Sequence, residues 1–203
     1  GNGVRTGAPA PLLTDLDGQM PGVAWDLLPM PRYRAHNWHC FGGLPRQPYA
    51  ALYTTLGCPY RCTFCCIQAP FKSGERAAGY KPEVNSYRFW SPAAVLAQID
   101  TLVTRYGVRN LKIADEMFVL NRRHVLDICR GITERGYDLN IWAYARVDTV
   151  RDEAMLEALA RAGCRWLAFG IEAGTGRVRD AVAKGFAQET IFAGLARVRA
   201  AGI

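Results

Sequence analysis

The sequence has no apolar run of roughly 18 residues, the length that a membrane-spanning helix requires. Its first residues, Gly1 to Gly3, lack the charged and apolar regions of a signal peptide, and no Met begins the chain. These absences favour a cytoplasmic protein. Because the last residues, Gly202 and Ile203, resemble the approach to another strand, we expect the chain to be a piece of a longer protein.

The sequence also lacks any run of five or more Lys or Arg residues, although the net charge is +7. Nucleic-acid binding is therefore not favoured, and the charge is equally compatible with an acidic or phosphorylated small substrate. The seven cysteines are not spread as in a secreted disulfide framework, because four of them fall between Cys58 and Cys66. Such a group in a chain without an export signal favours a reducing compartment and a metal site.

Two parts of the chain differ in composition. Residues 1–48 hold seven of the eleven prolines and show little periodicity, which predicts a linker and an irregular leading segment. From residue 49 onward, helices of 10 to 15 residues alternate with short apolar strands. We expect strands at 49–55, 111–114, 139–145 and 164–170. The expected helices follow Ser91, Asn121, Asp152 and Ala187, and Gly107, Gly136, Gly163 and Gly202 end them.

This alternation predicts an α/β fold with a parallel sheet. The roughly equal spacing of Gly107, Gly136 and Gly163 favours equivalent units around a barrel, and an open doubly wound sheet is the alternative. The chain ends after about four β/α units, before a barrel could close.

In parallel β/α folds the active site lies at the carboxyl ends of the strands. The first expected strand is followed by the segment from Cys58 to Cys66, and the second by Asp115 and Glu116. Arg146 and Asp148 follow the third strand, and Glu172 follows the fourth. We therefore expect these side chains to meet at one rim.

The cysteine spacing is C-x3-C-x2-C, formed by Cys58, Cys62 and Cys65. Thiolates suit iron–sulfur clusters or zinc, but structural zinc usually takes four ligands in two separated pairs. Cys66 adjoins Cys65 and points in a different direction. Three thiolates on a four-iron cluster leave one iron open for catalysis, so an iron–sulfur cluster is favoured over zinc and over plain buried thiols.

The string from Cys58 to Cys65, with Phe64 before the third cysteine, resembles the signature of radical S-adenosylmethionine (SAM) enzymes. The resemblance covers residues 49–203 and implies a partial (β/α)6 barrel of the TIM type, incomplete at its C-terminal end. It also implies a 4Fe–4S cluster whose open iron binds the amino and carboxylate groups of SAM. An electron from the cluster then cleaves SAM to methionine and a 5′-deoxyadenosyl radical, which abstracts a hydrogen from the substrate.

A narrower resemblance rests on three short segments, which are 25–29, 114–118 and 170–174. They look like the cobalamin-binding branch of that family, which includes methyltransferases and an anaerobic protoporphyrin-ester cyclase. This implies cobalamin-dependent methyl transfer to a small molecule, with cobalamin bound by a domain absent from this chain and a flavodoxin or ferredoxin as reductant. A radical cyclisation or rearrangement, and an iron–sulfur module without SAM chemistry, stay open.

The resemblance gives roles to the rim residues. Phe64 would lie near the adenine, Asp115 or Glu116 near the SAM amino group, Arg146 at its carboxylate and Glu172 at its ribose or amino group. All of them except Glu172 also have a plainer interpretation. Phe64 could be core, Asp115 and Glu116 could cap a loop, and Arg146 could form a surface ion pair with Asp148.

Four further features need interpretation. We expect Cys129 and Cys164 to be buried thiols and His124 to lie on a helix surface. We expect packing, and not metal binding, for His36, His39 and Cys40. Residues 66–90 predict a long loop that serves as a substrate or partner surface.

Overall fold

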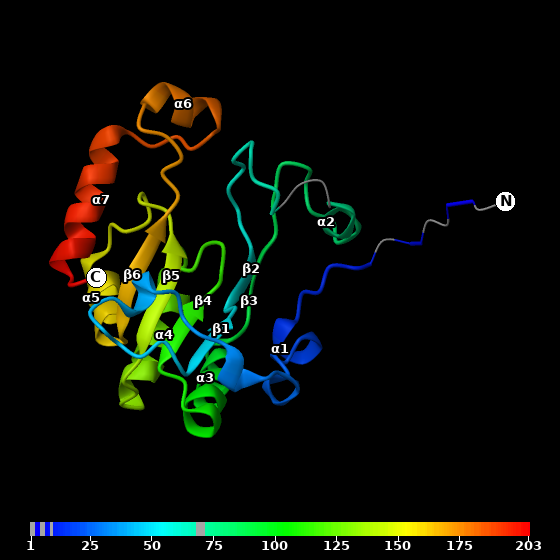
Figure 1. The fold of residues 1–203 in the computed structure, drawn as a ribbon. Helices are drawn as coiled ribbons and strands as arrows, with labels where there is room; N and C mark the ends of the chain where they lie inside the picture. The colour runs from blue at the N-terminus through cyan, green and yellow to red at the C-terminus, as the bar shows by residue number, and fades with distance from the viewer. Residues whose placement is uncertain (1–2, 5–6, 9, 68–71) are drawn as a thin grey trace.

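The computed structural model describes residues 3–4, 7–8, 10–67 and 72–203. Its centre is a parallel sheet of four strands: β1 (Tyr49–Leu52), β4 (Asn110–Ile113), β5 (Asn140–Ala145) and β6 (Cys164–Phe169). Their order in the sheet is their order in the chain (Figure 1). In a doubly wound sheet the strand order changes direction at one point, and here it does not. The fold is therefore the partial TIM-type barrel that the spacing predicts.

Helices α3 (Pro92–Tyr106), α4 (Arg122–Glu134) and α5 (Glu153–Arg161) connect these strands. Each begins where a side chain accepts a hydrogen bond from a free backbone N–H, as Ser91 does from Ala94 (3.1 Å). Asn121 and Asp152 cap the next two helices in the same way. The expected helix starts at these three residues are thus confirmed.

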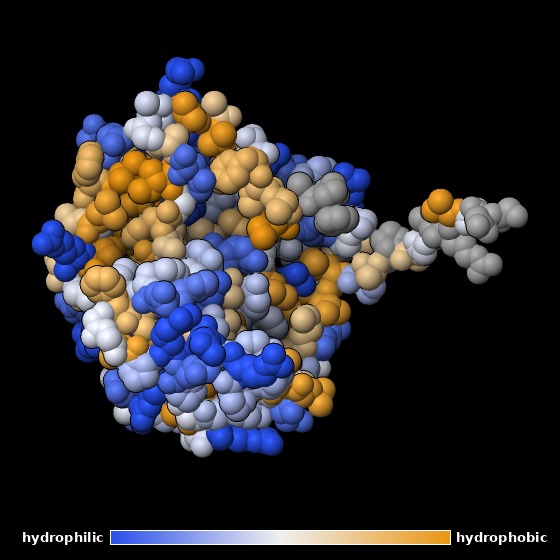
Figure 2. Space-filling model, in the orientation of Figure 1, coloured by the Kyte–Doolittle hydropathy of each residue, from blue (hydrophilic) through white to orange (hydrophobic). Residues whose placement is uncertain are grey.

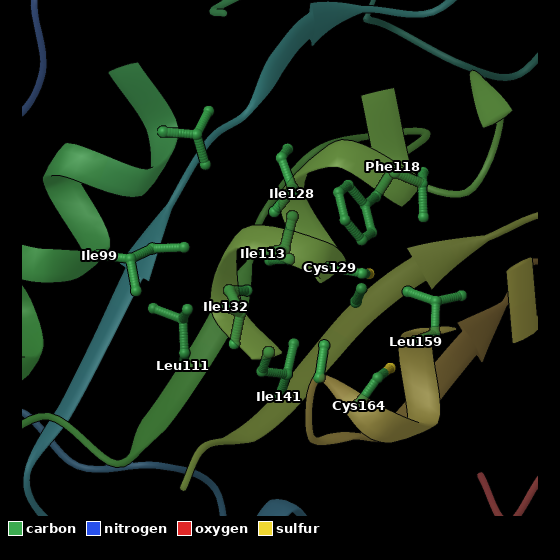
Figure 3. Packing of buried hydrophobic residues seen from close by; sticks show 14 of the residues in the cluster. Ile99, Leu111, Ile113, Phe118, Ile128, Cys129, Ile132, Ile141, Leu159 and Cys164 are labelled. Carbon is green, nitrogen blue, oxygen red and sulfur yellow. The ribbon is translucent and has the colours of Figure 1, made fainter. Parts of the chain in front are cut away.

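One face of the sheet packs against these helices to form the core (Figure 3). Leu111 and Ile113 of β4 meet Ile128 and Ile132 of α4, and all four are almost fully buried. The opposite, inner face carries polar and aromatic side chains. There the Lys112 ammonium lies 4.3 Å from the centre of the Trp142 ring.

The N-terminal segment holds a short helix, α1 (Leu16–Gln19), and the 3₁₀ turns η1 (Trp25–Leu27), η2 (Met30–Arg32) and η3 (Trp38–Cys40). Trp25 is buried in the main core, so this part of the segment packs on the domain. Trp38 of η3 packs edge-on against Trp142, 4.6 Å between ring centres, and covers part of the inner face. Within the described ranges, no helix combines the length and apolarity needed to cross a membrane.

The first strand differs from its expected range. It ends at Leu52, and the chain continues as β2 (Thr55–Gly57), which pairs antiparallel with β3 (Tyr87–Phe89). The break occurs at Thr54, whose backbone N–H bonds to Asp115. The stretch 66–90 was expected to be one long loop, but it contains α2 (Ser73–Ala77) as well as β3. Residues 68–71 lie outside the described residues.

Two helices complete the chain, α6 (Gly176–Ala181) and α7 (Gln188–Ala200). Sequence periodicity predicts α7 but not α6, which is only six residues long. In Figure 1, α6 stands beyond the carboxyl end of β6, and α7 runs back beside the sheet. The connection from β6 through α6 therefore borders the rim.

Candidate active site at the carboxyl rim of the sheet

The cysteine loop, residues 58–66, follows β2 and has no regular secondary structure. Cys58, Cys62 and Cys65 are of intermediate exposure and line one cavity of roughly 330 Å³. Cys66 is exposed and is not among the residues that line it. As they stand, no three His, Cys, Asp or Glu side chains of the described residues form a group that could hold a metal ion. The shared cavity nevertheless fits the donor set of a three-thiolate cluster.

The walls of this cavity are basic. Arg61, Lys72 and Arg76 line it, and none of the described residues lining it is acidic. Burial raises the pKa of the Cys58 thiol, whereas nearby cations favour thiolates and the net negative charge of a bound cluster. The cavity is therefore electrostatically suited to an anionic group.

The cysteine loop is fastened on both sides. On one side, Asn85 before β3 donates from Nδ2 to the carbonyl oxygen of Tyr60 (2.6 Å). On the other, the backbone N–H of Thr63 donates to the carbonyl oxygen of Val182 (3.3 Å), beyond α6. The loop thus lies between the β2–β3 ribbon and the segment that follows α6.

Arg146 lies at the end of β5, with only 5% of its surface exposed. Its guanidinium bonds Asp148 through two parallel contacts of 3.0 Å and donates from Nη1 to Sγ of Cys62 (3.7 Å). It also stacks on the ring of Tyr60 at 3.8 Å. From the sequence, Arg146 was expected to bind either the SAM carboxylate or Asp148 in an ion pair. The structure shows the ion pair, although in a buried setting beside a cysteine of the loop.

Asp115 is fully buried at the end of β4. Its carboxylate accepts hydrogen bonds from the N–H and hydroxyl of Thr54 (2.6 and 2.5 Å) and from the hydroxyl of Thr55 (2.9 Å). Burial raises its pKa to about 6, against the effect of these hydrogen bonds. The carboxylate therefore joins β4 to the break between β1 and β2, which is a different place from the loop before Asn121 that it was expected to cap.

Glu116 is the next residue in the chain. It is half-buried, and its buried Oε2 has no hydrogen-bond partner among the described residues. A buried carboxylate oxygen without a donor is costly unless a ligand or water supplies one. Of the two adjacent acids, Glu116 is therefore the one with an unmet hydrogen bond.

Glu172 follows β6 in a left-handed backbone conformation, with φ of +67°. One carboxylate oxygen lies 3.1 Å from Nζ of Lys184, and about a third of the side chain is exposed. Phe64 of the cysteine loop is half-exposed, and its ring centre lies 5.8 Å from the same Nζ. The structure thus brings Glu172 and Phe64 close to the same lysine. Figure 2 shows a hollow in this face beside a hydrophobic patch near the upper end of α7.

Lys184 is the rim residue that sequence analysis missed. It lies after α6, in a stretch without strand or helix periodicity, and no fixed spacing links it to the cysteines. Its one visible signal was the pair Lys184-Gly185, a turn sequence that leads into α7. Only the fold shows that it reaches back to β6.

The expectation for His124 was wrong. It is buried, and its Nε2 lies 3.0 Å from the Thr54 hydroxyl. Burial lowers its pKa to about 4. The first turn of α4 faces the β2–β3 ribbon, a contact that helical periodicity alone does not reveal.

The packing expected of Cys129, Cys164, His39 and Cys40 is confirmed, whereas His36 is exposed and stacks on Trp38. Burial raises the pKa of both Cys129 and Cys164 to about 12, and both lie in the core of Figure 3. The ring of His39 is buried with Nε2 3.0 Å from the carbonyl oxygen of Asn140. Cys40 donates to the side chain of Asn110 (3.2 Å).

Comparison with known proteins adds three findings. Residues 52–203 match the sequence profile of the Radical SAM superfamily. An uncharacterized methyltransferase of Pyrococcus horikoshii is 30% identical over 182 residues, which are 90% of this chain and 35% of that protein. The anaerobic magnesium-protoporphyrin IX monomethyl ester cyclase of Cereibacter sphaeroides is 27% identical over 177 residues, which are 85% of this chain and 25% of the cyclase. The chain thus spans about a third or less of these relatives.

Among solved structures, the cobalamin-dependent S-adenosylmethionine radical enzyme OxsB, with aqua-cobalamin and S-adenosylmethionine bound, superimposes with a TM-score of 0.63. It is 26% identical, and the match covers 75% of this chain and 22% of OxsB. Methylornithine synthase matches with a TM-score of 0.53 at 12% identity, over 76% of this chain and 42% of its own. The latter supports the fold alone.

Proposed function

Because the chain belongs to the Radical SAM superfamily, we propose that it is the part of a radical SAM methyltransferase that binds the 4Fe–4S cluster and SAM. The observation that carries the proposal is the cavity at the carboxyl rim that Cys58, Cys62 and Cys65 share. Three thiolates leave one iron of a four-iron cluster free for a ligand.

In this proposal Cys58, Cys62 and Cys65 hold the cluster, and Cys66 does not. When bound, the cluster supplies the electron that cleaves SAM. The basic side chains around the cavity offset its negative charge. Arg146, which stacks on Tyr60, contacts Cys62, and Asp115 fixes the break that precedes β2 and the cysteine loop.

The SAM-contacting residues are proposed from the same rim. Glu116 has a buried oxygen that lacks a donor, and Glu172 keeps an exposed part beside Lys184. Both are suited to the donor groups of SAM, which are its ammonium and ribose hydroxyls. Phe64 offers an exposed ring for the adenine.

Methyl transfer with cobalamin is supported by the relatives and not by residues of this chain. The methyltransferase relative matches 90% of the chain, and the OxsB structure contains cobalamin and SAM. We propose a small-molecule substrate, a cytoplasmic location and a flavodoxin or ferredoxin as electron donor. The cyclase relative keeps a radical cyclisation as the second candidate.

Anaerobic reconstitution of the full chain tests the proposal. We expect about four irons per chain, a brown colour, and release of 5′-deoxyadenosine from SAM on reduction. A variant with alanine at positions 58, 62 and 65 is the matched control and should lose all three. A colourless protein that holds one zinc, or one that holds iron but leaves SAM intact, would contradict the proposal.

A further inference from the structure

A lysine with a buried charge lies beside two of the residues proposed to contact SAM, Glu172 and Phe64. Only 8% of the Lys184 side chain is exposed. Its Nζ donates to the carbonyl oxygen of Gly170 (3.1 Å) and forms an ion pair with Glu172 (3.1 Å). An ammonium group is rarely buried without such partners, because the loss of hydration is costly. Both contacts lead to the end of β6.

The backbone around Lys184 contacts the other side of the site. Its carbonyl oxygen accepts a hydrogen bond from Nη2 of Arg146 (2.8 Å), at the end of β5. Just before it, the carbonyl oxygen of Ala183 lies 4.0 Å from Sγ of Cys62. The carbonyl oxygen of Val182 accepts from the N–H of Thr63. One short segment therefore touches β5, β6 and the cysteine loop.

Local geometry is adapted to the lysine–glutamate pair. A methyl group on Gly170 would lie 2.5 Å from Oε1 of Glu172 and 3.0 Å from Nζ of Lys184. Glu172 and Ala183 have φ of +67° and +55°, and among the described residues they are the only ones other than glycine with positive φ. Such conformations cost energy and persist where the surroundings fix them. Here they flank the contacts that Lys184 makes.

We propose that Lys184 is a positioning residue that holds the Glu172 carboxylate in the orientation that binds SAM. Lys184 is buried, whereas about a third of the Glu172 side chain is exposed. With one oxygen fixed by Lys184, the carboxylate presents its exposed part to a hydrogen-bond donor, such as an ammonium or hydroxyl group. Lys184 thus acts through Glu172 and does not touch the ligand. This inference rests on the proposed function, which places SAM at the rim.

A double-mutant cycle in the full, anaerobically reconstituted chain separates this role from plain packing. The variants are Lys184→Met, Glu172→Gln and the double variant, with SAM affinity measured by calorimetry and iron measured in the same samples. We expect each single change to weaken SAM binding about tenfold, the loss of one charged contact. The double variant should also bind SAM only about tenfold more weakly than the parent, because both changes remove the same shared contact. Iron content should match the parent in all three.

Two controls keep the result interpretable. Lys81→Met, at an exposed lysine, should bind SAM as the parent does. Gly170→Ala displaces the same ion pair without removing either charge, so it should also weaken SAM binding, and it serves if Lys184→Met does not fold.

The possible failures are distinguishable. Parent-like SAM affinity in both Lys184→Met and Gly170→Ala, beside a loss in Glu172→Gln, would overturn the positioning role. A roughly hundredfold loss in the double variant would mean that Lys184 acts independently of Glu172. If the parent itself bound iron but no SAM, the proposed function would fail instead.

Discussion

Nη1 of Arg146 lies 3.7 Å from Sγ of Cys62, so a buried guanidinium at the end of β5 contacts one of the three cysteines. The same guanidinium is held by Asp148 and by the carbonyl oxygen of Lys184. Its hydrogen-bonding groups are thus largely used within the protein. This arrangement favours a role for Arg146 in holding the cysteine loop over a role in binding the SAM carboxylate.

We therefore predict that Arg146→Met will release iron to a chelator about tenfold faster than the parent, the usual effect of losing a partner of a metal ligand. Arg146→Lys should be intermediate, because lysine keeps the charge but not the planar fork. Arg165→Met, at an exposed arginine, is the control. Unchanged iron retention together with weaker SAM binding would instead assign Arg146 to the SAM carboxylate.

The two adjacent cysteines provide a matched pair. Cys65 lines the cavity with Cys58 and Cys62, whereas Cys66 is exposed and does not. We predict that Cys66→Ser will keep about four irons per chain after reconstitution and that Cys65→Ser will lose the cluster. Iron analysis and the absorbance at about 400 nm measure the cluster content of the two variants. Equal losses in the two variants would show that the ligand set is misassigned.

Asp115 gives a prediction that separates a structural from a ligand-binding role. Asp115→Ala would leave the buried N–H of Thr54 without its acceptor, which costs about 1–3 kcal/mol of unfolding free energy. Urea denaturation of the cluster-free chain measures this. Asp138→Ala, at an exposed aspartate, should change stability little. A parent-like stability with weakened SAM binding would restore the role that the family resemblance implies.

Much of this site follows from the sequence, because it depends on local signals. The cap at Ser91 and the glycines that end the helices locate the strands, and the strand ends locate Arg146 and Glu172. The contacts that join distant segments do not follow. Neither the break of β1 at Thr54 nor the reach of Lys184 to Glu172 leaves a periodic pattern, since each depends on a tertiary contact.

The same limit explains the misplacement of His124. In α4 it falls on a turn whose partner is the β2–β3 ribbon, and β3 of this ribbon lies in the stretch 66–90 that was expected to be a loop. His124 contacts Phe89 of β3, with 5.1 Å between ring centres. A helix that packs on two elements has two buried faces, and only the one toward the sheet was visible in the spacing.

His124 also yields a pH-dependent prediction. Burial lowers its pKa in the folded chain to about 4, below the ordinary value of 6.5. As the pH falls below 6.5, the unfolded chain therefore binds a proton first, and stability is lost progressively down to pH 4. We predict that the parent will lose about 2 kcal/mol more than His124→Gln between pH 7 and pH 5. Asp115 has the opposite sign, because its raised pKa removes stability as the pH rises toward 6. It titrates in both proteins, so its effect is present on both sides of the comparison. Urea unfolding of the cluster-free chains at the two pH values provides the measurement. If parent and variant changed equally with pH, His124 would not be held neutral in the folded protein.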